Sequence, residues 1–139
     1  MGLQQIEVLS LAIVATTAVT ARRGVGFDGA QATVQGAKIQ GIAYTAAAIG
    51  DSLRLTAAGT AIVEAGAAIA VGQSLIVDAQ GRAIPSTGSL AVAAGAVAVT
   101  STAANGAILT GGDSPEYVFG DALEAAAAAG DFVEVFLRR

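Results

Sequence analysis

Glycines divide this chain into short segments that are rich in β-forming residues. Residues 52–56, 74–78 and 106–110 are such segments, and turn residues separate them at spacings of about ten residues. Between residues 74–78 and 82–85, Gly81 supplies the positive-φ position of a hairpin turn. Short strands at this spacing are typical of all-β proteins. The pattern therefore predicts a mainly β fold, either a small β-barrel or a sandwich.

One short C-terminal helix is also predicted. Ser114 is a good N-cap, and Pro115 suits the first helical position because its missing N–H costs nothing there. Gly130 suits the residue that follows the last turn, and a final strand is expected over residues 131–137. The predicted apolar face has helical spacing and consists of Val118, Phe119, Ala122, Leu123 and Ala126.

The N-terminal segment, residues 5–20, contains no Gly or Pro and is apolar on both faces of a strand. Such a run is either a buried strand of the core or an extended arm that lies against a partner. Both interpretations stay open, so residues 1–24 are assigned as an N-terminal arm or strand and residues 25–139 as the β-rich domain. On the arm interpretation, the contact residues are Ile6, Val8, Leu9, Leu11, Ile13 and Val14.

The same segment has the wrong polarity for a secretory signal. No Lys or Arg precedes it, whereas Arg22 and Arg23 follow it. It is also too short and too rich in hydroxyl side chains for a membrane span of about 20 apolar residues. The expectation is a chain with no membrane partner.

The residue types needed for most catalysis are missing. The chain has no Cys and no His, which removes thiolate chemistry, the commonest general base and the commonest metal ligand. The glycine string over residues 24–29 is followed by strand-like pieces rather than by the helix that a nucleotide site needs. We expect no enzyme, no cofactor and no metal, and structural roles for three carboxylate pairs: Asp113/Glu116, Asp121/Glu124 and Asp131/Glu134.

Charge is scarce and its balance is acidic. Only 13% of the residues are charged, against about 25% in an ordinary soluble domain. A net charge of −4 with seven basic residues argues against direct nucleic-acid binding, which needs a basic surface. Low charge reduces the desolvation cost of covering large areas, and small side chains let backbones approach closely. Both properties suit a subunit of an assembly.

Three stretches carry a resemblance to a known family. They are Gly50–Asp51, then GTAIVEAG over residues 59–66, then VGQSLIVDAQGRA over residues 71–83. Together with residues 120–137 they resemble the capsid cement, or head decoration, proteins of tailed bacteriophages. The resemblance spans about residues 25–137, and its motifs are structural rather than catalytic.

The resemblance implies a small β-barrel-like protein that forms homotrimers on the exterior of an icosahedral phage head. There it would bridge neighbouring major capsid proteins and oppose the pressure of packaged DNA, after synthesis in the cytoplasm of the bacterial host. The N-terminal segment would be the arm that contacts a subunit or the capsid. Alternatives are another virion component of the tail or baseplate, a β-sandwich module that binds glycans or small ligands, and, last, an enzyme. Two Tyr and no Trp argue against the binding module.

Overall fold

The computed structural model describes residues 3–86, 100–101, 109–110 and 116–138. Every element in this part of the chain is a β-strand, which confirms the mainly β prediction. The strands are β1 (Glu7–Val14), β2 (Gly24–Val25), β3 (Gly41–Ala43), β4 (Ser52–Glu64), β5 (Ser74–Val77), β6 (Ala83–Pro85), β7 (Thr100–Ser101), β8 (Leu109–Thr110), β9 (Gly120–Ala122) and β10 (Phe132–Leu137).

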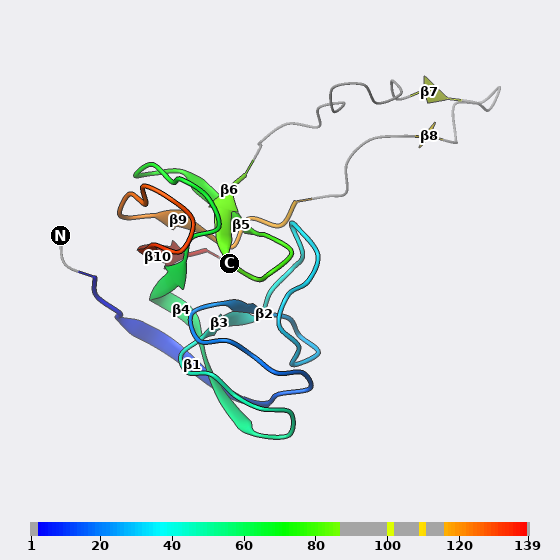
Figure 1. The fold of residues 1–139 in the computed structure, drawn as a ribbon, viewed down its shortest axis with the longest axis vertical. Helices are drawn as coiled ribbons and strands as arrows, with labels where there is room; N and C mark the ends of the chain where they lie inside the picture. Colours follow the sequence, from blue (N-terminus) through cyan, green and yellow to red (C-terminus); the bar gives the residue numbers. More distant parts are fainter. Residues whose placement is uncertain (1–2, 87–99, 102–108, 111–115, 139) are drawn as a thin grey trace.

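The sheet is antiparallel and nearly closes into a barrel. Its order is β2-β3-β4-β10-β9-β5-β6, and β1 pairs with β4 outside this path. Ala65, just after β4, forms a parallel bridge with Ala83 of β6. This bridge brings β6, the last strand in the order, next to the end of β4, which lies in the middle of the order. The Gly24 N–H of β2 also donates to the Gly81 carbonyl at 2.7 Å. Figure 1 shows β4 running from the part of the molecule that holds β1, β2 and β3 to the part that holds β5, β6, β9 and β10.

The core consists of two apolar clusters, and β4 contributes to both. Leu53 and Leu55 belong to the smaller cluster together with Val25, and Ala61 and Val63 belong to the larger one. Alternate residues of a strand face the same side, so one long strand can present inward side chains to each cluster in turn. Full burial of a Leu or Val side chain stabilises a fold by about 1.5–3 kcal/mol. β4 therefore joins the two clusters into one structure.

The predicted C-terminal helix is wrong for the described residues, which begin again at residue 116; Ser114 and Pro115 lie outside them. Residues 116–130 contain β9 and turns instead of a helix. At Gly120 a Cβ atom would stand 2.5 Å from the Phe136 carbonyl oxygen, so the lack of a side chain lets β9 lie tightly against β10. Pairing of β9 with β10 and β5 has overridden the local helical pattern.

Other local predictions are confirmed. The final strand is β10, and the hairpin of β5 and β6 turns at Gly81, whose φ is 76°. The strand segment expected at residues 52–56 is longer than predicted: β4 continues through Gly59, whose φ is 101°, as far as Glu64.

Candidate interaction surface

The N-terminal segment forms a strand at the side of β4. β1 pairs antiparallel with β4 from Val14 opposite Ser52 to Glu7 opposite Gly59, with irregular register near its start. Within the described residues no strand pairs with the opposite edge of β1. An unpaired strand edge presents N–H and C=O groups that a further strand can bind.

The six residues predicted to make contacts divide into two groups. Leu11 and Ile13 are half-buried and pack against the smaller apolar cluster. Exposed fractions are far higher for the other four: Ile6 60%, Val8 79%, Leu9 48% and Val14 62%. The segment thus combines features of both interpretations, because one set of side chains packs on the core and another is open to a partner.

Polar side chains hold the start of β1 against β4. The Glu7 carboxylate accepts hydrogen bonds from the Thr56 hydroxyl at 2.6 Å and from Ser10 at 2.9 Å, and it forms an ion pair with Arg54. Gln5 also donates to Glu7, at 2.9 Å. Partial burial raises the pKa of Glu7, but the hydrogen bonds from Thr56, Ser10 and Arg54 and the Arg54 charge outweigh it and hold the pKa below its ordinary value. The charged form of Glu7 therefore stabilises the attachment of β1.

Two arginines extend this polar attachment. The guanidinium carbons of Arg22 and Arg54 each lie 4.7 Å from the centre of the Tyr44 ring. Arg22 also donates a hydrogen bond to the Gln5 side chain. Cation–π contacts of this kind contribute about 0.5–1 kcal/mol at exposed sites. The first residues of the chain are thus held to the barrel mainly by charged and polar contacts.

β10 adds exposed aromatic rings beside the N-terminus. Phe132 and Phe136 are each 50% exposed and share a face with Glu134, which is buried and accepts a hydrogen bond from the Gln4 N–H at 3.0 Å. Phe136 lies opposite Thr60, whose hydroxyl accepts a hydrogen bond from the backbone N–H of Ile6 at 2.9 Å. We call Ile6, Phe132 and Phe136 the apolar surface. The sequence signal for the two phenylalanines was their period-2 spacing on the last strand.

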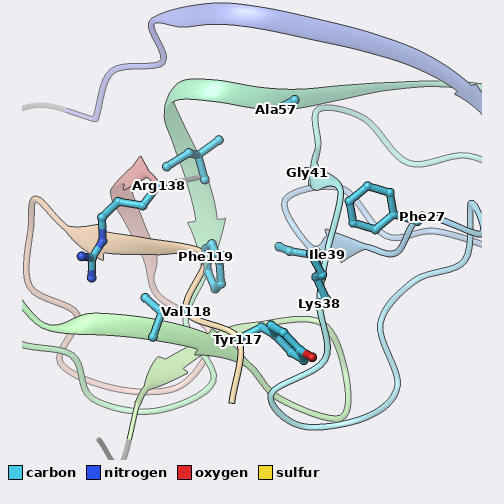
Figure 2. A pocket seen from close by; sticks show the side chains of 10 residues that line it. Phe27, Lys38, Ile39, Gly41, Ala57, Tyr117, Val118, Phe119 and Arg138 are labelled. Carbon is cyan, nitrogen blue, oxygen red and sulfur yellow. The ribbon is translucent and has the colours of Figure 1, made fainter. Parts of the chain in front are cut away.

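A pocket of about 310 Å³ opens between residues that precede β3 and the segments around β9 and β10. Aromatic rings of Phe27, Tyr117 and Phe119 line it. Figure 2 shows Phe27 and Lys38 on one side of the pocket and Arg138 on the other. The ammonium of Lys38 stands 5.7 Å from the centre of the Phe27 ring and 6.0 Å from that of Tyr117. Sequence reasoning did not identify this pocket, because its lining comes from segments far apart in the chain.

Two of the acidic residues for which structural roles were expected, Asp121 and Asp131, form contacts with nearby side chains or backbone amides. Asp121 forms an ion pair with Arg138 at 2.7 Å and accepts a hydrogen bond from Ser74. Asp131 accepts hydrogen bonds from the backbone amides of Ala127 and Ala128, which closes the turn before β10. Asp113 lies outside the described residues. The described ranges hold no group of three or more potential metal ligands and no helix long and apolar enough to cross a membrane.

Comparison with known proteins links this geometry to viral particles. The family model described as phage cement protein matches residues 3–137. A solved structure titled "The crystal structure of head fiber gp8.5 N base in bacteriophage phi29" has a TM-score of 0.60 and 22% sequence identity. The match covers 94% of this chain and 93% of that chain, and at this identity it shows a shared fold. No curated protein sequence matches the chain.

Proposed function

This chain belongs to the phage cement protein family, and we propose that it binds the outer surface of an icosahedral phage head and joins neighbouring major capsid proteins. The family assignment makes it a structural protein of a phage virion. The proposal adds the outer surface of the head as the location, the major capsid protein as the partner, and the joining of neighbouring capsid proteins as the mode of action.

The exposed apolar residues of the N-terminal strand are the observation that carries the proposal. Val8, Leu9 and Val14 are large exposed apolar side chains on β1, a strand whose second edge has no partner in the described structure, and Ile6 directly precedes this strand. Contiguous exposed apolar residues mark interaction sites on soluble proteins. We assign these four residues to direct contact, and we assign Leu11 and Ile13 to holding the strand on the core. Residues 1–24 then act as the arm, and residues 25–139 as the domain that the arm anchors.

Cementing in this sense is mechanical. A stable protein interface buries about 1,200–2,000 Å² in total, and such an interface across a boundary between capsid subunits must be broken before the boundary opens. Homotrimers would supply three arms, and multivalent attachment raises the overall affinity well above that of one arm. No catalysis, cofactor, nucleic acid or membrane is needed for this role.

The first test is the number of copies of this chain per major capsid protein, measured by quantitative mass spectrometry of purified particles. A ratio near one supports a shell-wide cement protein. A handful of copies per particle would overturn that role and favour a fibre base or tail component, the alternative to which the head-fibre neighbour points. Absence from the particle would overturn both.

The second test addresses the arm. Heads that lack the chain are mixed with purified protein and sedimented, and the bound fraction is measured against protein concentration. The double substitution Ile6→Ser and Val8→Ser is expected to weaken binding by about tenfold or more, while a control pair of exposed apolar residues, Ile49→Ser and Val71→Ser, leaves it unchanged. Equal binding by both pairs would contradict the role of the arm. Analytical ultracentrifugation of the free protein and of protein released from heads tests the trimer.

A further inference from the structure

The geometry points to the pocket beside Lys38 as a second docking site, which takes a peptide segment with a large apolar side chain next to a carboxylate, supplied by a protein other than this chain. This inference rests on the proposed function for its setting, since it gives the capsid surface a second point of contact. It concerns a part of the molecule that is separate from the N-terminal arm.

Lys38 has no anionic partner among the residues that the structure describes. It is the sole lysine of the chain. Four described arginines form ion pairs with carboxylates: Arg23 with Glu64, Arg54 with Glu7, Arg82 with Asp78 and Arg138 with Asp121. The ammonium of Lys38 has no carboxylate within ion-pair distance among the described residues and stands over two aromatic rings instead.

The pocket has the character of a site for an acidic and apolar group. The described residues that line it include no acidic side chain, although the chain has more acidic residues than basic ones. The positive charge of Arg138, the other cation in the lining, is already balanced by Asp121 at 2.7 Å. Lys38 is therefore the charge to which an incoming carboxylate would bind, and its ion pair would lie at the mouth of a pocket lined by Tyr117 and Phe119 (Figure 2).

Partial exposure of the lining leaves room for an apolar side chain. Phe27 is 58% exposed and Tyr117 is 50% exposed, so a side chain inserted between them would remove apolar area of both rings from water. A volume of about 310 Å³ is within the range of ordinary ligand pockets, about 300–1,000 Å³. One aromatic or branched aliphatic side chain fits such a space.

Seven described carboxylates of a second copy of this chain are poor sources of that segment, because each already has a partner. Besides the four carboxylates in ion pairs, Asp28, Asp51 and Asp131 accept hydrogen bonds from backbone amides of their own turns. To offer one of these groups to Lys38, a copy would have to give up a local contact. The surface of a different protein carries no such cost, so we assign the segment to the capsid.

The test uses peptides first, because they probe the pocket without heads. Acetyl-Ala-Phe-Glu-Ala-amide and its Gln counterpart are titrated into ¹⁵N-labelled full-length protein, and backbone amide shifts are followed by NMR. The acidic peptide is expected to shift the signals of Lys38, Ile39 and Phe119 and to bind about tenfold more tightly than the Gln peptide, a difference that falls with added salt. Equal affinities, or shifts confined to other residues, would overturn the inference.

Head binding provides the second measurement. Lys38→Met keeps the apolar stem and removes the charge, and it is expected to weaken sedimentation with heads by about tenfold. Gln35→Glu is the matched control, because it changes the net charge of the chain by the same amount at a nearby exposed residue and should leave binding unchanged. Normal head binding by Lys38→Met would overturn the capsid as the source. Self-association that Lys38→Met abolishes would likewise overturn it in favour of a second copy.

These outcomes separate the two proposals. If wild-type protein fails to bind heads while the peptide still binds beside Lys38, the cement role and the capsid as the source of the segment both fail, and the pocket stands as a peptide site. If heads bind and the peptide does not, the pocket fails and the cement role stands.

Discussion

The Glu7 carboxylate and the Arg54 guanidinium form an ion pair that joins the start of the N-terminal strand β1 to the first part of the longest strand, β4. The Thr56 hydroxyl, which is fully buried, donates to the same carboxylate at 2.6 Å. The side chain of Arg54 is 53% exposed, so its charge is well screened by solvent, whereas the hydrogen bond from Thr56 is shielded. Much of the energy of this attachment therefore comes from the buried hydrogen bond.

Replacing Glu7 with Ala should destabilise the protein. The change leaves the buried Thr56 hydroxyl with fewer partners and removes the ion pair with Arg54, so the free energy of unfolding is expected to fall by about 1–2 kcal/mol. Urea denaturation followed by circular dichroism measures it. Glu7→Gln, which retains a hydrogen-bond acceptor, should lose less. Equal losses for the two variants would contradict a dominant role for the hydrogen bond.

Stability should also depend on pH through Glu7. Its pKa is lower in the folded protein than the ordinary value of 4.5, so the folded state binds the proton less readily than the unfolded chain does. The stabilisation is fully present above about pH 4.5 and is lost as the pH falls through the folded pKa. The difference in unfolding free energy between wild type and Glu7→Gln should stay constant from about pH 7 to about pH 5 and shrink below that range. A difference that grew on acidification would contradict the direction of the shift.

Gly59→Ala should detach the start of β1. A Cβ atom at this position would stand 2.2 Å from the Ile6 carbonyl oxygen, and the φ of 101° is unfavourable for alanine. The expected loss is about 2 kcal/mol or more, measured by thermal or urea unfolding. Gly72→Ala is the matched control, because its φ of 82° carries similar strain while a Cβ there meets nothing within 4 Å. A loss no larger than that of the control would show that β1 does not press on Gly59.

The exposed phenylalanines of β10 should affect binding rather than folding. Phe132→Ser and Phe136→Ser together are expected to change the unfolding free energy by less than about 1 kcal/mol, because both rings are half-exposed. If the apolar surface contacts the capsid together with Ile6, the same pair should reduce sedimentation with heads several-fold. Val133→Ala, a change at a fully buried residue between them, should show the opposite pattern of lower stability and normal binding. Reduced head binding by Val133→Ala alone would argue against the apolar surface.

The fold class could be predicted from the sequence because strand segments and turns are local signals. Gly81 and the alternating residues of β10 occupy the positions that their spacing indicates. The helix predicted after Pro115 was wrong because the apolar spacing of Phe119 and Ala122, which fits a helix, also fits side chains buried in a β-structure. Contacts with β10 and β5, which come from residues distant in the chain, decide between the two.

The candidate surfaces were accessible to sequence reasoning only in part. The apolar N-terminal run predicted either an arm or a core strand, but its division into core-facing Leu11 and Ile13 and the four exposed residues depends on the register with β4. The Lys38 pocket could not be found in this way. Its rings come from Phe27, Tyr117 and Phe119, and only the folded barrel brings these segments together.

The position of β4 has a mechanical consequence. β1 and β10 both run antiparallel to this one strand, β1 along Ser52–Gly59 and β10 along Gly59–Glu64. A pull along the strand axis on the residues that precede β1 would load the hydrogen bonds of the β1–β4 ladder side by side, in shear, rather than peel them open one after another. The tension would then pass along β4 into the β10 ladder and the larger cluster. A chain built in this way can transmit load through its own backbone pairing, which is the property that the proposed role at the joints of a pressurised shell requires.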